Sequence, residues 1–551
     1  MRNRLPTFGD ACVGNPDAPR IAGVGTVVAI ECVVSTDRRS ANAHRTHRAD
    51  RGPSLRTQVT TTPKAQTMKL LEPLNINGMR VPNRVVVPAM VTRLCGDDGF
   101  VSDAIFERYV RYAQGGVGLI VVEAMAIHGS SAGPLLRIGD DKFIPGLKAM
   151  TQRIHDISDS KVVPQLIHFL KISKSGWRQT VDMLSHEDID RIVEQFGQAA
   201  VRAREAGFDG IELHNAHAYT LASFVSSANT RTDAYGGNTL EGRLHLIGRV
   251  MDSVRRHAGP DFPVGIRYLA DEFIRGGYTV EDAKLIGLRM ARLGADYLSL
   301  SVGGKFEDAV HTPGQVLHGY SGYSGERCMP GAEYPPALHA PLAAEVRRFL
   351  RGKGLDVPII TAGKLSDPAA AERVLAEGQA DMIGIARGLL ADPDWVNKVR
   401  TGQTDRIVKC DYCNVCKQLD GAHMPVTCFL WPKGQLQAPP PGTDSEVPHW
   451  PEGRAGLTVK RDPGSITLKW KKAAGNAAHY DVYRVDGDGA PHIVDGVRLP
   501  VFTDASLLAD VGYRYYVRAC NAAGDASAPS ENVHIDPTDS TLALVTTTAR
   551  T

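Results

Sequence analysis

The sequence predicts an α/β protein in which a (β/α)8 TIM barrel is followed by a small all-β sandwich. Between residues 84 and 390, short runs rich in β-branched residues alternate with longer stretches of helical periodicity, the pattern of repeated βα units. After residue 454 the pattern changes to short strands with a period of two. Eight βα units favour a closed parallel barrel. A doubly wound open sheet is the alternative.

The barrel is expected to occupy residues 68–400, and each of its strands precedes a turn or a helical stretch. The eight strands are expected at Arg84–Val87, Leu119–Glu123, Val162–Leu166, Gly210–Leu213, Val264–Arg267, Tyr297–Ser301, Pro358–Thr361 and Met382–Ile385. Because the strands run parallel, their carboxyl ends gather on one face of the barrel, where such folds carry their chemistry.

The segments outside the predicted barrel differ from it in composition. Residues 1–67 lack a sustained period and are predicted to be a disordered extension, and residues 538–551 a disordered tail. The proline-rich residues 435–454 are expected to form a linker. No apolar run is long enough to span a bilayer. A net charge of +2 does not indicate a nucleic-acid-binding protein.

Polar and small residues fall at the predicted strand ends, namely Glu123, Gln165, His214, His217, Arg267, Gly363 and Arg387. An amide such as that of Gln165 can donate and accept at once, as a partner of a ring with alternating N–H and C=O groups must. Arg267 supplies a permanent cation. The glycine-containing loops around Gly363 and Arg387 are typical of a phosphate site, although ordinary tight βα turns have the same composition.

Two histidines follow the fourth strand, separated by three positions, and Tyr219 lies two residues beyond the second. The imidazoles of His214 and His217 would converge if the chain turned into a helix there. Two N–H donors could then hold a carbonyl oxygen. One histidine alone would more often be structural, but two at this spacing with a tyrosine favour a catalytic role.

Four cysteines in the segment 401–434 are spaced C-x2-C-x2-C-x11-C: Cys410, Cys413, Cys416 and Cys428. Three thiolates within seven residues and a fourth nearby are typical of a [4Fe–4S] cluster. Structural zinc is the alternative, although zinc ligands usually come as two separated pairs. The other cysteines are scattered singly and indicate no disulfide framework. A cytoplasmic location is expected, and Ile21–Val34 has only a weak signal-peptide shape.

Several ordered motifs resemble those of the old yellow enzyme superfamily of FMN-dependent NADH:flavin oxidoreductases, over about residues 70–434. They are Asn83–Met90 (NRVVVPAM), Gly118–Ala124 (GLIVVEA), Pro164–His168 (PQLIH), His214–Tyr219 (HNAHAY), Asn229–Asn238 (NTRTDAYGGN) and Ala380–Arg387 (ADMIGIAR). The four cysteines narrow the match to the cluster-bearing branch, which includes 2,4-dienoyl-CoA reductase, enoate reductase and trimethylamine dehydrogenase.

The resemblance implies that Ala89, Ala124, Gln165 and Arg267 border the isoalloxazine ring and that Gly363 and Arg387 hold the FMN phosphate. It implies that His214 and His217 polarise the carbonyl of an enone or of an enoyl or dienoyl thioester. Tyr219 would give a proton to the α-carbon after hydride from flavin N5 reaches the β-carbon. NAD(P)H is the expected electron donor, and a small unsaturated carbonyl compound the expected substrate.

Other activities are compatible with the same resemblance. One is an amine dehydrogenase or demethylase that passes electrons from flavin through the cluster to a protein partner, and another is a catalytically idle scaffold. Met90 stands where trimethylamine dehydrogenase attaches its flavin to cysteine, so non-covalent FMN is expected. His168 is followed by Phe169, where the family usually has glycine and arginine, so one wall of the site is altered. No G-x-G-x-x-G follows Cys428, so no internal nucleotide-binding donor domain is expected.

Residues 455–537 resemble a fibronectin type III module. The strands Ser465–Trp470, Tyr480–Val485 and Tyr513–Ala519, with Leu507 six residues before Tyr513, carry the likeness. Trp470 is expected in its core rather than in a ligand site. The module is expected to contact another protein, a second copy in a homo-oligomer, or a polymer. The long connection 303–345 is expected to act as a lid or substrate-binding element.

Overall fold

The computed structural model describes residues 68–536, apart from 130–132, 172–178, 305–325, 333, 433, 440–446, 463, 476, 488, 490, 509–510 and 522–523. The predictions for residues 1–67 and 538–551, and most of the predicted lid, lie outside the described residues. In the part of the chain that is described, no helix combines the length and the apolarity that a membrane crossing requires.

Eight parallel strands close into a barrel, with strand order β10-β3-β4-β5-β6-β7-β8-β9. They are β3 (Val85–Val87), β4 (Leu119–Ala126), β5 (Lys161–Ile167), β6 (Ile211–Asn215), β7 (Val264–Leu269), β8 (Tyr297–Ser301), β9 (Ile359–Ala362) and β10 (Met382–Gly384). Every predicted strand is present, and closure between β3 and β10 excludes the open sheet. The predicted barrel is confirmed.

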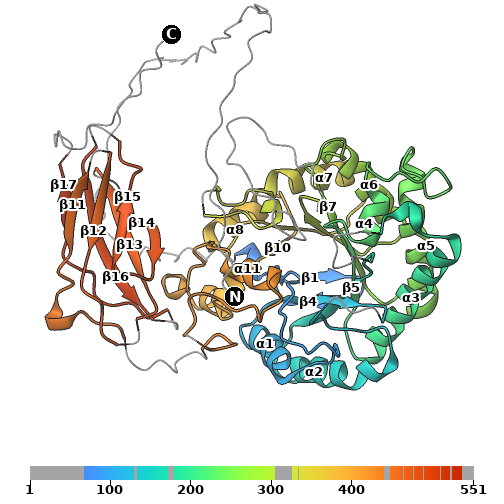
Figure 1. The fold of residues 1–551 in the computed structure, drawn as a ribbon, viewed down its shortest axis with the longest axis horizontal. Coiled ribbons are helices and arrows are strands. Elements are labelled where there is room, and N and C mark those ends of the chain that lie inside the picture. Colours follow the sequence, from blue (N-terminus) through green and yellow to red (C-terminus); the bar gives the residue numbers. More distant parts are fainter. Residues whose placement is uncertain are drawn as a thin grey trace, which may run out of the picture. The chain divides into compact units, whose positions relative to one another are not determined.

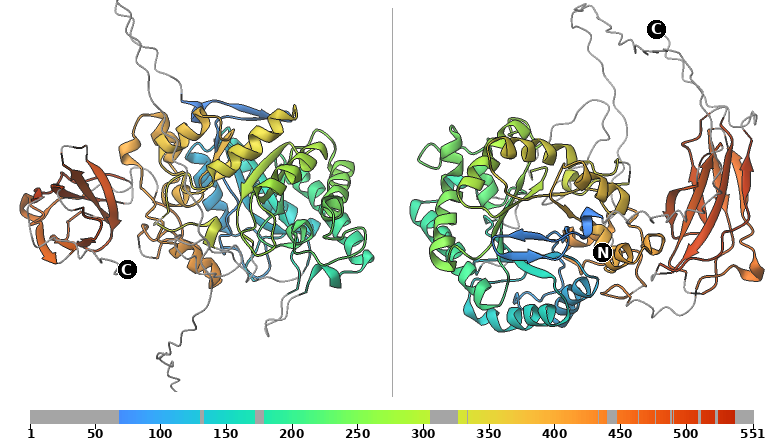
Figure 2. Two further views of the ribbon diagram at one scale, coloured as in Figure 1. Left: turned by 90° about the horizontal axis from the view of Figure 1, so that it is seen from above. Right: turned by 180° about the vertical axis from the view of Figure 1, so that it is seen from behind.

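Helices form the outer layer around this barrel (Figures 1 and 2). They are α1 (Asp103–Gln114), α2 (Ile144–Ile157), α3 (His186–Glu205), α4 (Thr220–Val225), α5 (Leu240–Ala258), α6 (Val280–Arg292), α7 (Ala340–Gly352), α8 (Pro368–Ala376), α9 (Arg387–Ala391) and α10 (Trp395–Arg400). Side-chain caps mark the starts of some of these helices: Ser185, for example, forms a capping box with Asp188 at α3. The helices bury their apolar faces against the strands in one large core.

A short hairpin precedes the barrel, formed by β1 (Leu74–Ile76) and β2 (Met79–Val81). Its apolar side chains Ile76, Met79 and Val81 join the inward-facing residues of the strands in a separate buried cluster. That cluster includes Leu119, the first residue of β4, so the hairpin fills the amino-terminal end of the barrel interior. The carboxyl end is thereby left as the end at which a ligand can enter.

The C-terminal domain consists of two antiparallel sheets. The first contains β11 (Thr458–Asp462), β12 (Ser465–Lys469) and β15 (Val501–Asp504), and the second β14 (His492–Val497), β13 (His479–Asp486), β16 (Tyr513–Cys520) and β17 (Val533–Ile535). Side chains of both sheets share one core, in which Trp470 is buried as predicted. The Tyr513 hydroxyl accepts a hydrogen bond from the backbone N–H of Leu508 (2.7 Å), a corner that β-sandwiches commonly use. The predicted sandwich is confirmed, while the fibronectin type III assignment stays a prediction.

Candidate active site

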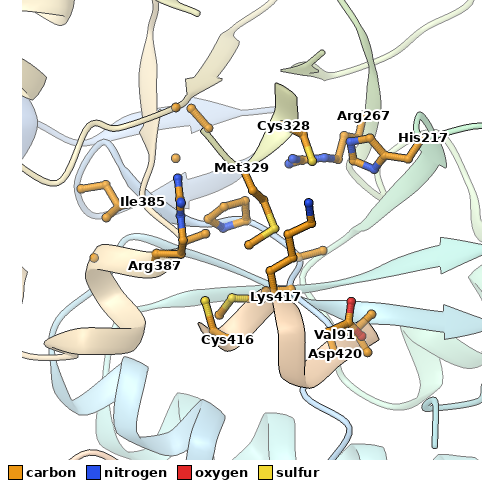
Figure 3. A pocket seen from close by; sticks show the side chains of 18 of the residues that line it. Val91, His217, Arg267, Cys328, Met329, Ile385, Arg387, Cys416, Lys417 and Asp420 are labelled. Atoms are coloured by element: carbon orange, nitrogen blue, oxygen red, sulfur yellow. The ribbon is translucent and has the colours of Figure 1, made fainter. Parts of the chain in front are cut away.

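A pocket lies at the carboxyl end of the barrel and brings together every flavin-site and catalytic residue predicted from the sequence. His217, Arg267 and Arg387 are labelled among its lining side chains in Figure 3. Those residues are Ala89, Ala124, Gln165, His214, His217, Tyr219, Arg267, Gly363 and Arg387. About 1190 Å³ inside the pocket is not filled by protein, part of it open to solvent. Cys416 of the predicted cluster segment also lines it, so the two candidate cofactor sites are neighbours.

The two histidines meet by a different route from the one predicted. The chain does not turn into a helix after His214: β6 continues to Asn215, and α4 begins only at Thr220. Between them His217 and Ala218 both adopt the left-handed conformation, with φ of 56°. Two successive non-glycine residues in this region are costly, and such strain concentrates at functional sites. The turn brings the His214 ring within 5.2 Å of the His217 ring and 4.8 Å of the Tyr219 ring, measured between centroids.

Both imidazoles are held in the neutral form. Burial is the main cause that lowers the pKa of His217 to about 3 and the pKa of His214 well below its usual range, and the Arg267 cation lowers both pKa values further. One nitrogen of His217, Nε2, contacts the Ser301 hydroxyl at 2.8 Å. The Nδ1 atom of His214 is buried and has no hydrogen-bond partner among the described residues. A buried polar atom of this kind is expected to be satisfied by a ligand.

Inside the barrel, Gln165 and Arg267 meet a residue that the sequence reasoning missed, Glu212. The Gln165 side-chain amide Nε2 donates to the Glu212 carboxylate at 2.7 Å, and the two residues are register partners on β5 and β6. Because a carboxylate accepts the amide N–H, the Gln165 carbonyl oxygen is left for another partner. Glu212 precedes His214 by two positions on a strand, so the period of two could have placed it on the inner face.

The two predicted phosphate loops also line the pocket. Gly363 has φ of 115°, and a Cβ atom there would lie 2.5 Å from Nδ1 of His339, so the position requires glycine. Arg387 already has protein partners: its Nη1 donates to the carbonyl oxygen of Pro330 (2.8 Å) and to the side chain of Asn414 (2.5 Å). Arg387 therefore contacts both the pocket and the cysteine segment.

Tyr412, within the cysteine segment, is a second residue that the sequence reasoning missed. Its hydroxyl lies 2.5 Å from Oγ of Ser366, and the cations of Lys364 and Arg387 lie 4.7 and 4.8 Å from its ring centre. These contacts connect the cysteine segment directly to the phosphate end of the pocket.

The four predicted cluster ligands lie around α11 (Val415–Gly421), with Cys416 buried and Cys413 exposed. Backbone N–H groups of Tyr412 and Leu430 approach the sulfurs of Cys410 (3.4 Å) and Cys428 (3.5 Å), and N–H···S contacts are a usual way to stabilise cluster thiolates. A single tetrahedral zinc would draw its sulfurs to roughly 3.8 Å from one another. Among the described residues, no three of these thiols lie within 4.8 Å of one another. The choice of a [4Fe–4S] cluster over zinc stays a prediction.

The segment after β5 packs against a neighbouring aromatic ring. The His128 ring lies 4.6 Å from the His168 ring and 4.3 Å from the Phe169 ring. The His168 Nδ1 atom contacts the Thr220 hydroxyl at 2.8 Å. Burial is the main cause that lowers the pKa of His128 to about 4 and that of His168 to about 3. His128, His168 and Phe169 do not line the pocket, so the predicted change in one wall of the site stays a prediction.

Glu123, the first polar strand-end residue predicted, does not reach the pocket. A register shift in β4 between Val122 and Ala124 turns its side chain away from the barrel interior. Its carboxylate Oε2 accepts from the backbone N–H of Thr92 and from the Tyr109 hydroxyl, each at 3.2 Å. Burial raises the pKa of Glu123 to about 7.

We expect Glu123 to make the stability of the barrel depend on pH. The folded chain keeps a proton that the unfolded chain has lost above pH 4.5, so the free energy of unfolding falls as pH rises from 4.5 to about 7. The loss amounts to about 3 kcal/mol. Glu123→Gln, which stays neutral, should remove this fall when the two proteins are unfolded in urea at pH 5 and pH 8. Equal falls in both proteins would contradict the assignment.

Comparison with known proteins shows the family of the chain. Residues 69–182, 170–311 and 343–406 match the NADH:flavin oxidoreductase / NADH oxidase family. The chain is 32% identical to an NADH oxidase of Thermoanaerobacter brockii, over 62% of this chain and 52% of the relative. It is 30% identical to a cinnamate reductase of Clostridium sporogenes, over 64% of this chain and 55% of the relative.

Among solved structures, histamine dehydrogenase from Rhizobium sp. 4-9 superposes with a TM-score of 0.57 at 23% identity, covering 72% of this chain and 55% of that one. The chain thus spans about half the length of the relatives that it matches. The resemblance to the old yellow enzyme superfamily predicted from the motifs is confirmed, and this chain belongs to the NADH:flavin oxidoreductase / NADH oxidase family.

Proposed function

We propose that this chain is an FMN- and [4Fe–4S]-dependent reductase of activated C=C bonds, acting on an enone or on an enoyl or dienoyl thioester. FMN, when bound, supplies the hydride for the β-carbon, and the cluster carries single electrons. The observation that carries the proposal is the convergence of His214, His217 and Tyr219 with Gln165 and Arg267 in one pocket.

The two histidines hold the carbonyl oxygen of the substrate. As neutral imidazoles they donate N–H groups without losing a proton, and the unpartnered Nδ1 of His214 is available for this purpose. The negative charge that develops on the oxygen during hydride addition is stabilised by these donors, as in an oxyanion hole. Tyr219, beside the His214 ring, gives the proton to the α-carbon.

Gln165, Arg267, Ala89 and Ala124 are the residues that we propose to border the flavin ring, with Gly363 and Arg387 at its phosphate. Met90 also lines the pocket and cannot form the thioether that a cysteine would, so FMN binds non-covalently. Cys410, Cys413, Cys416 and Cys428 hold the cluster. Electrons enter from NADH or NADPH at the pocket, or from a protein partner through the cluster.

The test is to purify the protein without oxygen, measure flavin, iron and sulfide, and follow flavin bleaching after addition of NADH or NADPH. Bound FMN, about four irons and oxidation of the reduced enzyme by an enone are expected. Bleaching by an amine, with electrons passed to a dye acceptor, would favour amine oxidation instead, the activity named for the structural relative histamine dehydrogenase. Absence of both cofactors would favour the alternative that the chain is a catalytically idle scaffold.

Glu212 should matter for FMN affinity because it fixes the orientation of the Gln165 amide. Replacing Glu212 with leucine removes the acceptor and leaves the amide free to flip, so FMN binding should weaken by about tenfold, the cost of one unsatisfied buried polar group. Glu212→Gln, which keeps an acceptor, should bind FMN nearly as the natural protein does. The FMN affinity of each variant is measured by titrating the flavin-free protein with FMN and monitoring flavin fluorescence. Equal affinities for the leucine and glutamine variants would contradict the role of Glu212 in orienting Gln165.

A further inference from the structure

The sandwich domain contains a cluster of metal-binding side chains that lies outside the cysteine segment and outside the flavin pocket. His479 and Asp481 come from β13, and Cys520 comes from the neighbouring strand β16. One ligand atom from each of the three residues lies within 4.8 Å of the other two. In the part of the chain that the structure describes, this is the one such group of three or more histidine, cysteine and acidic residues.

The strand pairing explains why these three side chains converge. Tyr480 and Val482 of β13 point into the sandwich core, so His479 and Asp481, which alternate with them, lie on the opposite face. Cys520 is the direct partner of His479 across the ladder, and side chains of directly paired residues lie on the same face. A pair at i and i+2 on one strand plus a cross-strand neighbour is the arrangement by which a β-sheet can present three ligands to one ion.

The distances suit a single small cation. Nε2 of His479 lies 3.4 Å from Oδ1 of Asp481, and the Cys520 sulfur lies 3.6 Å from Oδ2 of Asp481. Ligand atoms bound to one tetrahedral zinc at 2.0–2.3 Å are roughly 3.3–3.8 Å apart. One ligand atom from each of the three side chains lies within 4.8 Å of the others, so a single ion could contact all three once they draw closer together.

The chemistry of the three side chains also favours metal binding. The His479 side chain is 5% exposed, and its Nδ1 atom has no hydrogen-bond partner among the described residues. Nε2, the ring nitrogen that lies next to Asp481, is the atom placed to offer its lone pair to an ion. Binding of the ion would form a bond between the metal and the Cys520 sulfur, and the thiol proton would pass to solvent.

We propose that His479, Asp481 and Cys520 bind a divalent zinc ion. One imidazole, one carboxylate and one thiolate suit zinc, which accepts nitrogen, oxygen and sulfur ligands. Three protein ligands leave a fourth position for water or an outside ligand. The three side chains line a common cavity, through which an ion can enter. This site is independent of the function proposed for the barrel.

The experiment uses the full chain with its flavin and iron loaded, freed of loose metal by dialysis against a chelator. Zinc is then added, excess is removed by gel filtration, and bound zinc per chain is measured by elemental analysis. The natural protein should retain one more zinc ion per chain than His479→Ala or Cys520→Ala. All three proteins keep the cysteine segment, so any zinc bound by that segment is the same in each of them. His534→Ala, on β17 of the same sheet, and Cys95→Ala, a buried cysteine of the barrel, are the matched controls and should bind as the natural protein does.

Equal zinc content in the natural protein and in both ligand variants would overturn the proposal. If Cys520→Ala fails to fold, Asp481→Asn decides the question, because it preserves the size of the side chain and removes the charge. Its zinc dissociation constant should rise at least tenfold, and an unchanged constant would count against the site. With cobalt as the probe, a sulfur-to-cobalt absorption band is expected in the natural protein and not in Cys520→Ser.

Discussion

Replacing Tyr219 with phenylalanine is expected to slow enone reduction by about 10²–10⁴-fold, the usual contribution of a positioned general acid. Tyr219 lines the pocket next to His214 and is held there by the left-handed turn at His217 and Ala218. Phenylalanine keeps the ring contact and removes the proton donor alone. Without this donor, the enolate that forms returns its hydride to the flavin unless water protonates it, so net reoxidation of the flavin becomes slow.

The two half-reactions separate this role from a general loss of structure. Flavin reduction by NAD(P)H does not use the tyrosine proton, so its rate should be unchanged, while reoxidation by the enone should become slow. Stopped-flow absorbance of the flavin measures both steps. Tyr516→Phe, in the sandwich, is the control for a lost tyrosine hydroxyl and should leave both rates intact. Unchanged reoxidation in Tyr219→Phe would assign the proton to another group.

Much of the barrel and its pocket could be predicted because both depend on local pattern. Strands such as Leu119–Glu123 and Tyr297–Ser301 are visible as β-branched runs, and a parallel barrel brings their carboxyl ends together whatever the details of packing. The positions of Gln165, His214 and Arg267 followed from that rule alone.

What the sequence could not show depends on register and on contacts between distant segments. A one-residue shift in β4 sends Glu123 out of the pocket, and nothing in the local sequence marks it. The pairing of Gln165 with Glu212 depends on how β5 and β6 align. The contacts of Arg387 with Asn414 and Tyr412 join residues more than twenty positions apart, so they exist only in the folded chain.

The cysteine segment gives the other large expected effect: Cys416→Ala should reduce bound iron from about four per chain to nearly none. Cys416 is 8% exposed and packs with Leu390, Val426 and Trp431, so an outside thiol cannot readily replace it. Without a metal, burial raises the pKa of Cys410 to about 12 and that of Cys413 to about 11. The thiols are therefore deprotonated only when a metal binds, and loss of one ligand weakens the binding of the other three.

The same variant tests whether the cysteine segment supports the flavin pocket. Tyr412 and Asn414, which lie between the ligands, contact Ser366, Lys364 and Arg387 at the phosphate end of the pocket. If the cluster orders these residues, Cys416→Ala should also bind FMN more weakly, whereas Cys95→Ala should retain full iron and flavin. Iron and sulfide analysis with flavin titration gives both quantities. A zinc ion that the natural protein binds in place of iron and that Cys416→Ala loses would exclude the cluster. Unaltered FMN affinity after loss of iron would show that the pocket forms without it.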